Sequence, residues 1–250
     1  MDATEILEKI ARGRTDYVLE LLRLPDWKKL LATKPVSPLQ WLVYYNDLTA
    51  LRCVLKAGGD LSGMDLDSEL GNAAFFGHWK ICDFLIAQGA EVNSQVPGTG
   101  ETPLHSALSK AGRPYYAFTV RVLVENGADV NAATLPGMET GAFMRDVRTK
   151  GETPLHRAAA FADLQTIEYL LAAGADKTVR DAHGDSPLGW ASMHLRPGEI
   201  LRALSFGPHQ ISEAHARVNR SDHGAGWGSG MDWNLFGDYL PDAANPKKPA

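Results

Sequence analysis

The sequence predicts an all-α fold, a solenoid of stacked helix–turn–helix units, and three observations support this prediction. The stretch Gly-Glu-Thr-Pro-Leu-His occurs twice, at 100–105 and at 151–156. Each copy leads into an Ala-containing helical pattern that ends in a Gly-Ala-Asp turn, at 127–129 and at 174–176. Apolar residues recur at helical spacing before such turns. A duplicated element of this kind indicates a repeat array, which favours a binding surface over an enzyme.

Each unit is predicted to open at a Thr or Ser and to close at a Gly. The openers are Thr4, Ser37, Ser68, Thr102, Thr153 and Ser186, and the closing glycines are Gly58, Gly89, Gly127, Gly174 and Gly207. The openers follow one another at 31 to 34 residues, except for the step from Thr102 to Thr153. That step holds a short insertion around Gly112–Tyr116 and a longer one within Ala132–Lys150.

Local chemistry justifies the two helices of each unit. A Thr or Ser before Pro makes an N-cap with Pro at the first helical position, where its missing N–H costs nothing. The second helices carry one apolar face, and the closing Gly supplies the left-handed conformation that ends a helix. Those faces are Leu48, Leu51, Val54 and Leu55; Trp79, Cys82, Leu85 and Ile86; and Leu164, Ile167, Leu170 and Leu171. One helix pair cannot bury such a face alone, so neighbours must stack.

At Thr102–His105, Thr153–His156, 89–93 and 127–131 the chain resembles the ankyrin-repeat family. The resemblance implies an ankyrin-repeat solenoid in which each unit has a β-turn finger and two antiparallel helices. It covers roughly residues 4–207. We therefore expect a degenerate N-terminal capping repeat at 1–34, then five repeats at 35–207 with an inserted loop at 132–150. A Gly/Pro-rich tail follows at 208–250.

Composition narrows the classes of function. The net charge of −5 and the pI near 5.9 give no basic footprint for nucleic acid. No apolar run has the length of a membrane span, and the N-terminus has no basic region followed by an apolar core, so we expect neither membrane insertion nor a signal peptide. Cys53 and Cys82 fall on second helices and are read as small buried hydrophobes, which fits a reducing cytoplasm. We also expect a monomer without a metal or other cofactor.

The family geometry implies where a partner binds. The first helices and the fingers line a concave side, and the two residues after the Ala-Ala pair of each first helix face it. The large or polar side chains at these positions are Tyr44, Tyr45, Phe75, Phe76, Lys110, Phe161, Met193 and His194. Aromatic residues are enriched at interface hot spots, so the pattern predicts a partner-binding stripe. The alternative is that these rings pack on neighbouring turns and stabilise the stack.

Three further segments are candidates for contact. The finger residues are predicted to tune specificity at the rim, or else to be solvated turn residues. They are Glu101, Glu152, His183 and Asp185, beside Thr99, Thr149, Lys150 and Ala182. In the 132–150 loop, Phe143 and Met144 are expected either to pack on the stack or to contact the partner. In the tail, Met231–Leu240 is expected to cap the last repeat or to act as a recognition peptide.

The sequence predicts non-catalytic protein–protein interaction through the concave groove. His105 and His156 are interpreted as turn-stabilising residues, and His209, His215 and His223 match no metal signature. No nucleophile elbow, zinc-protease motif or dinucleotide fingerprint occurs. Three alternatives stay open: an inhibitor or immunity-type protein that occludes one enzyme, an enzyme whose site lies in the tail, and a purely structural role.

Overall fold

The computed structural model describes residues 1–109, 115–138, 140 and 151–207, and every regular element within these residues is helical. The chain divides into two units. Unit 1 comprises Met1–Ala107 and Arg113–Asp129, and unit 2 comprises Leu108–Gly112 and Val130–Ala250. The prediction of an all-α fold is confirmed.

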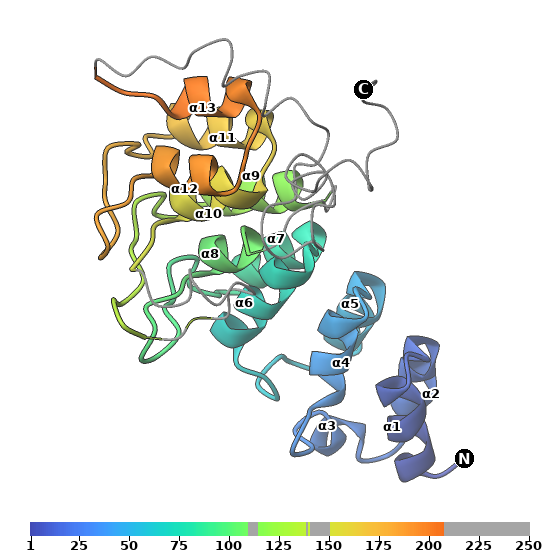
Figure 1. The fold of residues 1–250 in the computed structure, drawn as a ribbon. Coiled ribbons are helices and arrows are strands. Elements are labelled where there is room, and N and C mark those ends of the chain that lie inside the picture. The colour runs from blue at the N-terminus through green and yellow to red at the C-terminus, as the bar shows by residue number, and fades with distance from the viewer. Residues whose placement is uncertain (110–114, 139, 141–150, 208–250) are drawn as a thin grey trace, which may run out of the picture. The chain divides into compact units, whose positions relative to one another are not determined.

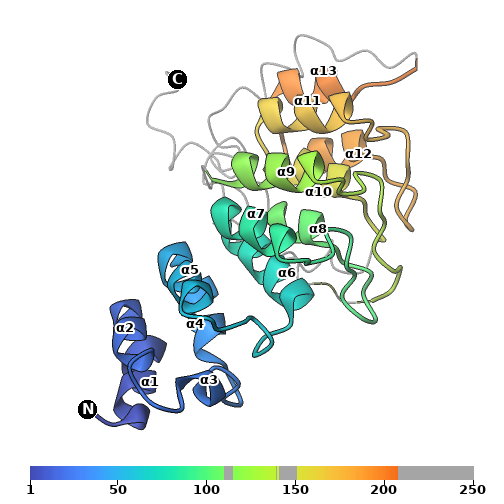
Figure 2. The same cartoon turned by 180° about the vertical axis from the view of Figure 1, so that it is seen from behind.

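Unit 1 stacks helix pairs, as Figures 1 and 2 show from two sides. Its elements are α1 (Ala3–Ala11), the 3-10 helix η1 (Thr15–Tyr17), α2 (Val18–Leu21), α3 (Trp27–Leu30), α4 (Pro38–Tyr44), α5 (Leu48–Lys56), α6 (Leu66–Phe76), α7 (Trp79–Ala87), α8 (Pro103–Ala107) and α9 (Tyr116–Glu125). Within each of the pairs α4–α5, α6–α7 and α8–α9 the helices contact each other. First helices also contact first helices (α4 with α6, α6 with α8), and second helices contact second helices (α5 with α7, α7 with α9). This is the stacking that the one-sided apolar faces predict.

Unit 2 repeats the same arrangement with two helix pairs. Its helices are α10 (Pro154–Phe161), α11 (Leu164–Ala172), α12 (Pro187–Met193) and α13 (Gly198–Leu204). In Figure 1 the first helices α10 and α12 lie side by side, and so do the second helices α11 and α13, which the contacts between them confirm.

The predicted helix starts are confirmed where Pro follows the opener. Ser37 Oγ accepts a hydrogen bond from the N–H of Leu39 at 3.1 Å, and Ser186 Oγ accepts one from the N–H of Gly189 at 3.3 Å. In the Thr-Pro-Leu-His elements the Thr N–H donates to the His Nδ1, at 3.3 Å in 102–105 and 3.2 Å in 153–156. The interpretation of these two histidines as turn-stabilising residues fits this geometry.

Two predicted starts are wrong. Thr4 and Ser68 lie inside α1 and α6, which are capped by Asp2 and Asp65 instead. Asp2 accepts from the N–H of Glu5 at 2.8 Å, and Asp65 accepts from the N–H of Ser68 at 3.3 Å. Without a following Pro to fix the first turn, an upstream carboxylate is the better cap, because its charge also favours the positive end of the helix.

The predicted helix ends are confirmed at Gly58, Gly89, Gly127 and Gly174, each two residues after the last residue of its helix. The prediction is wrong for Gly207, because α13 ends at Leu204 and the next residue, Ser205, is extended. All five closing glycines have positive φ: Gly58, Gly89, Gly127, Gly174 and Gly207. Residues other than Gly rarely adopt this backbone conformation, so the first four glycines mark where their second helices stop.

The two cysteines lie on second helices, as predicted. Cys82 is fully buried in α7, and burial raises the pKa of its thiol. Cys53 in α5 is half-buried. Cys82 therefore packs as a small apolar side chain whose thiolate form is disfavoured.

An asparagine at each Val-Asn turn fastens one repeat to the next. In unit 1, Asn93 Nδ2 donates to the carbonyl of Gly127 at 2.9 Å, while its Oδ1 accepts from the N–H of Asp129 at 2.7 Å. In unit 2, Asn131 makes the equivalent pair of bonds to Gly174 and Asp176, at 3.0 and 2.8 Å. Each side chain thus satisfies two backbone groups of the following turn.

We expect Asn93→Ala to lower the free energy of unfolding by about 1 kcal/mol, because two solvent-accessible hydrogen bonds are lost. Asn93→Asp keeps the acceptor and loses the donor, so its cost is smaller. Urea unfolding followed by circular dichroism measures both. The exposed neighbour Gln95 supplies the control, Gln95→Ala, and equal effects of Asn93→Ala and the control would show that the two bonds contribute nothing.

Candidate functional site

The C-terminal ends of α4 and α6 place a group of aromatic side chains together in unit 1. We call Trp41, Tyr44, Tyr45, Phe75 and Phe76 the aromatic face. The ring of Tyr44 lies 5.9 Å from that of Trp41 and 5.2 Å from that of Phe76, both edge to face. Tyr44 is 49% exposed and Tyr45 is 37% exposed. The structure therefore brings together four of the side chains predicted for the partner-binding stripe.

The members of the aromatic face differ in how firmly they are held. Tyr45 stacks on Trp41 with 6.0 Å between ring centroids, and its hydroxyl donates to the carbonyl of Ala11 at 2.8 Å. Phe76 stacks on His78 at 5.6 Å. For Tyr45 the packing interpretation holds, because its ring and hydroxyl both bind within the fold. Tyr44 is the most exposed ring of the face.

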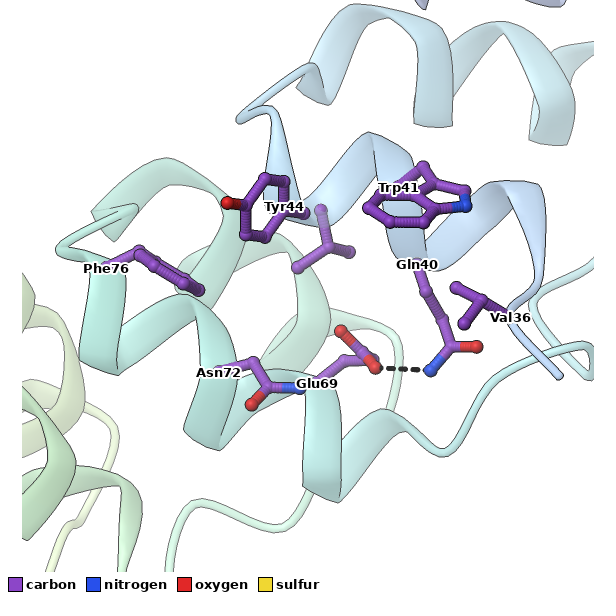
Figure 3. A pocket seen from close by; sticks show the side chains of 8 residues that line it. Val36, Gln40, Trp41, Tyr44, Glu69, Asn72 and Phe76 are labelled. Atoms are coloured by element: carbon purple, nitrogen blue, oxygen red, sulfur yellow. Dashed lines mark hydrogen bonds between the residues drawn. The ribbon is translucent and has the colours of Figure 1, made fainter. Parts of the chain in front are cut away.

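Beside Tyr44 lies a pocket of about 250 Å³ between α4 and α6 (Figure 3). Its lining residues are Val36, Gln40, Trp41, Val43, Tyr44, Glu69, Asn72 and Phe76. Figure 3 shows Tyr44 and Trp41 entering from α4 and Glu69, Asn72 and Phe76 from α6. The pocket thus combines aromatic walls with a small polar group.

The polar side chains of the pocket surround Glu69, which is only 3% exposed. Gln40 Nε2 donates to Glu69 Oε1 at 2.8 Å, and the side chain of Asn72 also bonds the carboxylate. Burial raises the pKa of Glu69, and the nearby charge of Asp65 raises it further, while the two amide bonds oppose the shift. The charged carboxylate is therefore held in an environment that disfavours it.

We expect Glu69→Gln to raise the melting temperature at neutral pH by about 2–4 °C. The pKa of Glu69 is higher in the folded than in the unfolded chain, so the wild type loses stability as the pH rises through the folded-state value. Gln carries no charge and still accepts from Gln40. Below the unfolded-state pKa, Glu69 is protonated in both states and the two chains should melt alike. Calorimetry of both chains from mildly acidic to neutral pH tests this, and a lower melting temperature for the variant at neutral pH would contradict it.

Two groove residues of unit 2 that were predicted to be exposed are buried. Phe161 is 8% exposed and His194 is 3% exposed, and their rings pack edge to face at 5.5 Å. The cause is that α10 is buried along its whole length, so its last residue, Phe161, packs against the end of α12. Met193 is 45% exposed, as predicted.

Two predicted rim residues are also buried. Glu101 is 6% exposed and Glu152 is fully buried, whereas His183 is exposed and Asp185 is half-buried. Each finger closes by a backbone bond near its end: the N–H groups of Val96, Thr134 and Asp181 donate to the carbonyls of Glu101, Glu152 and Asp185 at 2.8, 3.0 and 2.8 Å. The residue after the finger Gly therefore lies at the closed base in all three fingers. Glu101 and Glu152 are buried there, whereas the 181–185 finger leaves His183 exposed and Asp185 half-buried.

A buried ion pair in unit 2 explains the burial of Glu152. Arg157 Nη2 lies 2.7 Å from Glu152 Oε1, and both side chains are inaccessible to solvent. Arg157 also donates to Ser109 Oγ at 2.8 Å and to Thr140 Oγ1 at 3.1 Å. Thr134 Oγ1 donates to Glu152 Oε2 at 2.9 Å. The network ties Thr134 and Thr140 of the inserted loop to Glu152 and Arg157. This network was not predicted from the sequence, where its one signal is the charged Arg157 in the Leu-His-Arg-Ala-Ala-Ala run.

A second aromatic cluster lies on second helices of unit 1 and was also missed. Tyr115 is 62% exposed and Phe118 52% exposed, and Phe118 lies 5.8 Å from the ring of Trp79. The spacing of Tyr115 and Phe118, three residues apart, is the sequence signal that could have revealed it. We call Trp79, Tyr115 and Phe118 the second-helix patch.

The remaining predicted contacts lie outside the described residues. These are Lys110, Phe143, Met144, Thr149, Lys150 and the tail segment Met231–Leu240. Among the residues that the structure does describe, no group of three His, Cys, Asp or Glu side chains is placed to hold a metal ion. No helix in the same residues is long and apolar enough to cross a bilayer.

Comparison with known proteins agrees with this repeat architecture. Residues 39–134 match the family described as "Ankyrin repeats (3 copies)", and residues 150–182 match "Ankyrin repeat". A putative ankyrin repeat protein of Rickettsia felis is 31% identical over 186 residues, which are 69% of this chain and 70% of that protein.

Two much longer proteins are also similar. Human Rabankyrin-5 is 33% identical over 123 residues, covering 48% of this chain and 10% of that protein. Human neurogenic locus notch homolog protein 2 is 31% identical over 177 residues, covering 62% of this chain and 7% of that protein. The chain thus spans about a tenth or less of these two relatives. Ankyrin repeats generally mediate protein–protein interactions. The matched repeats and the stacked helix pairs together show that this chain belongs to the ankyrin-repeat family.

Proposed function

We propose that this chain is a non-catalytic interaction module that binds a protein partner through the aromatic face of unit 1. The observation that carries the proposal is the exposed ring of Tyr44 beside a pocket of about 250 Å³. An exposed aromatic side chain next to a concave site is the usual composition of an interface hot spot, since it buries a large area at little cost in side-chain entropy.

The rest of the face supports the same role. Trp41 stacks on Tyr45, and Phe76 packs edge to face on Tyr44, so a partner meets a surface whose side chains are already ordered. Preordered side chains lower the entropy lost on binding. In unit 2, the exposed Met193 and His183, with Asp185, are additional proposed contacts. We further propose that the chain acts as a monomer in a reducing, cytoplasmic compartment, which the buried thiol of Cys82 suits.

The experiment compares two substitutions that each remove one exposed aromatic ring. Tyr44→Ala removes the central ring of the aromatic face, and Phe118→Ala removes an equally exposed ring of the second-helix patch. Both chains, with the wild type, are used to capture partners from native lysate, and circular dichroism confirms their helix content. We expect the wild type and Phe118→Ala to capture the same protein, and Tyr44→Ala to capture at least tenfold less of it.

The reverse pattern contradicts the proposal. If Phe118→Ala loses the partner while Tyr44→Ala retains it, the second-helix patch is the binding surface. If both variants retain it, neither aromatic surface of unit 1 binds the partner.

A second candidate function is a dedicated inhibitor or immunity-type protein that occludes one enzyme. The net charge of −5 favours it, because an acidic chain suits a basic target. A 1:1 complex that abolishes the activity of one captured enzyme and weakens steeply with added salt would support this candidate. A captured partner without enzymatic activity would exclude it.

A further inference from the structure

The pocket between α4 and α6 has a composition that selects among ligands. Trp41, Tyr44 and Phe76 supply aromatic walls, and Glu69 is the one carboxylate among the lining residues. In Figure 3 these rings and the carboxylate lie around the same space. Aromatic rings attract cations through the negative charge of their faces, and a carboxylate attracts them directly.

The size of the pocket favours a single side chain over a small molecule. Its volume of about 250 Å³ lies just below the range of roughly 300–1,000 Å³ that is usual for small-molecule sites. A long side chain of a partner protein enters such a space while its backbone stays at the surface, beside the exposed ring of Tyr44.

The charge in the pocket is incompletely matched. Glu69 is 3% exposed, and its hydrogen-bond partners are the neutral amides of Gln40 and Asn72. Neutral amides solvate a buried carboxylate only in part, and burial accordingly raises the pKa of Glu69. A cation that reaches the carboxylate would offset the desolvation that the fold imposes.

We infer that this pocket takes an arginine side chain of the protein partner, with its guanidinium group between the aromatic walls and the carboxylate of Glu69. The inference rests on the proposed partner-binding role of the aromatic face. Arginine fits better than lysine, because its planar group stacks on rings and keeps donors free for a carboxylate. Asp65 caps the helix that carries Glu69, Asp67 lies in its first turn, and the chain has a net charge of −5, so the surroundings also favour a basic segment.

Random linear peptides displayed on phage provide the probe. They are selected on the full-length wild-type chain in the presence of excess soluble Glu69→Gln chain, which removes peptides that do not need the carboxylate. We expect the selected peptides to share an arginine. Replacing that arginine by citrulline, its uncharged isostere, should weaken binding at least tenfold, and replacing it by lysine should weaken it several-fold.

A double-mutant cycle then locates the arginine. If it contacts Glu69, citrulline should cost almost nothing further in the Glu69→Gln chain, because each change removes the same interaction. Glu125→Gln is the matched control, since it removes one exposed carboxylate from α9 of the same unit. It should leave binding within about twofold. A loss as large as that of Glu69→Gln would assign the effect to long-range charge and overturn the inference.

The remaining outcomes separate the inference from the proposed function. Peptides that lose binding in Tyr44→Ala but carry no arginine, or that bind equally with citrulline, overturn the arginine pocket and leave the aromatic face as the binding surface. Equal binding of the lysine peptide overturns the choice of arginine. If Tyr44→Ala leaves the binding of every selected peptide unchanged, the result overturns both the arginine pocket and the proposed binding surface.

Discussion

Replacing Arg157 by alanine is expected to lower the free energy of unfolding of unit 2 by about 3–5 kcal/mol. Arg157 and Glu152 are both inaccessible to solvent, and the arginine reaches Glu152 through two nitrogens, Nε at 2.9 Å and Nη2 at 2.7 Å. Truncation removes both guanidinium bonds and the compensating positive charge from the buried Glu152 carboxylate. An uncompensated buried charge is among the most costly defects in a folded protein.

Removing both charges should recover most of this loss. The double variant Arg157→Met with Glu152→Gln keeps an acceptor for Thr134 and removes both charges of the buried pair. Buried ion pairs are often neutral relative to well-packed uncharged replacements, because desolvation offsets their attraction.

Urea unfolding measures the loss in each Arg157 variant, and hydrogen exchange of unit 2 segments assigns it to that unit. Arg202→Ala, which changes an exposed arginine of α13, is the control and should stay within about 0.5 kcal/mol of the wild type. A cost for Arg157→Ala no larger than that of the control would show that the pair does not hold unit 2 together.

The second large effect is expected at Trp190, which has the largest fully buried side chain among the described residues. Its Nε1–H donates to Asp181 Oδ2 at 2.9 Å, and its ring packs edge to face on His156 at 5.3 Å. Trp190→Ala should cost about 3–5 kcal/mol through the cavity that it leaves. Trp190→Phe keeps much of the volume and loses the hydrogen bond, so about 1–3 kcal/mol is expected.

The Trp190 variants should also loosen the 181–185 finger. Asp181 Oδ1 accepts from the N–H groups of His183 and Asp185, each at 2.9 Å, so the same carboxylate orders the finger and binds the tryptophan. Thermal unfolding gives the stability change, and faster amide exchange at His183 and Asp185 reports the finger. Met193→Ala, at an exposed position of the same helix, should change neither. Unchanged exchange in Trp190→Phe would mean that Asp181 orders the finger without the tryptophan.

Part of the candidate site could be read from the sequence. The Tyr44-Tyr45 and Phe75-Phe76 pairs were predicted from their place after the first helices, and their rings do gather into one face. The pocket beside them could not be predicted, because it needs Glu69 from α6 and Gln40 from α4 to meet across 29 residues. Phe161 follows the same local pattern and yet is buried, since its exposure depends on how closely the next first helix packs.

The sequence by itself determined the paired helices and most of their boundaries, the starts of α1 and α6 being exceptions. Pro after Thr or Ser, Gly after each second helix and apolar residues at helical spacing act over a few residues, so they are legible without the fold. Tertiary structure alone decided which polar side chains are buried. Arg157 donates to Ser109, which lies 48 residues away in the sequence. Glu152 is buried and not exposed at the rim, because Arg157 compensates its charge. Burial is a property of the stacked repeats, and a pattern confined to one repeat does not contain it.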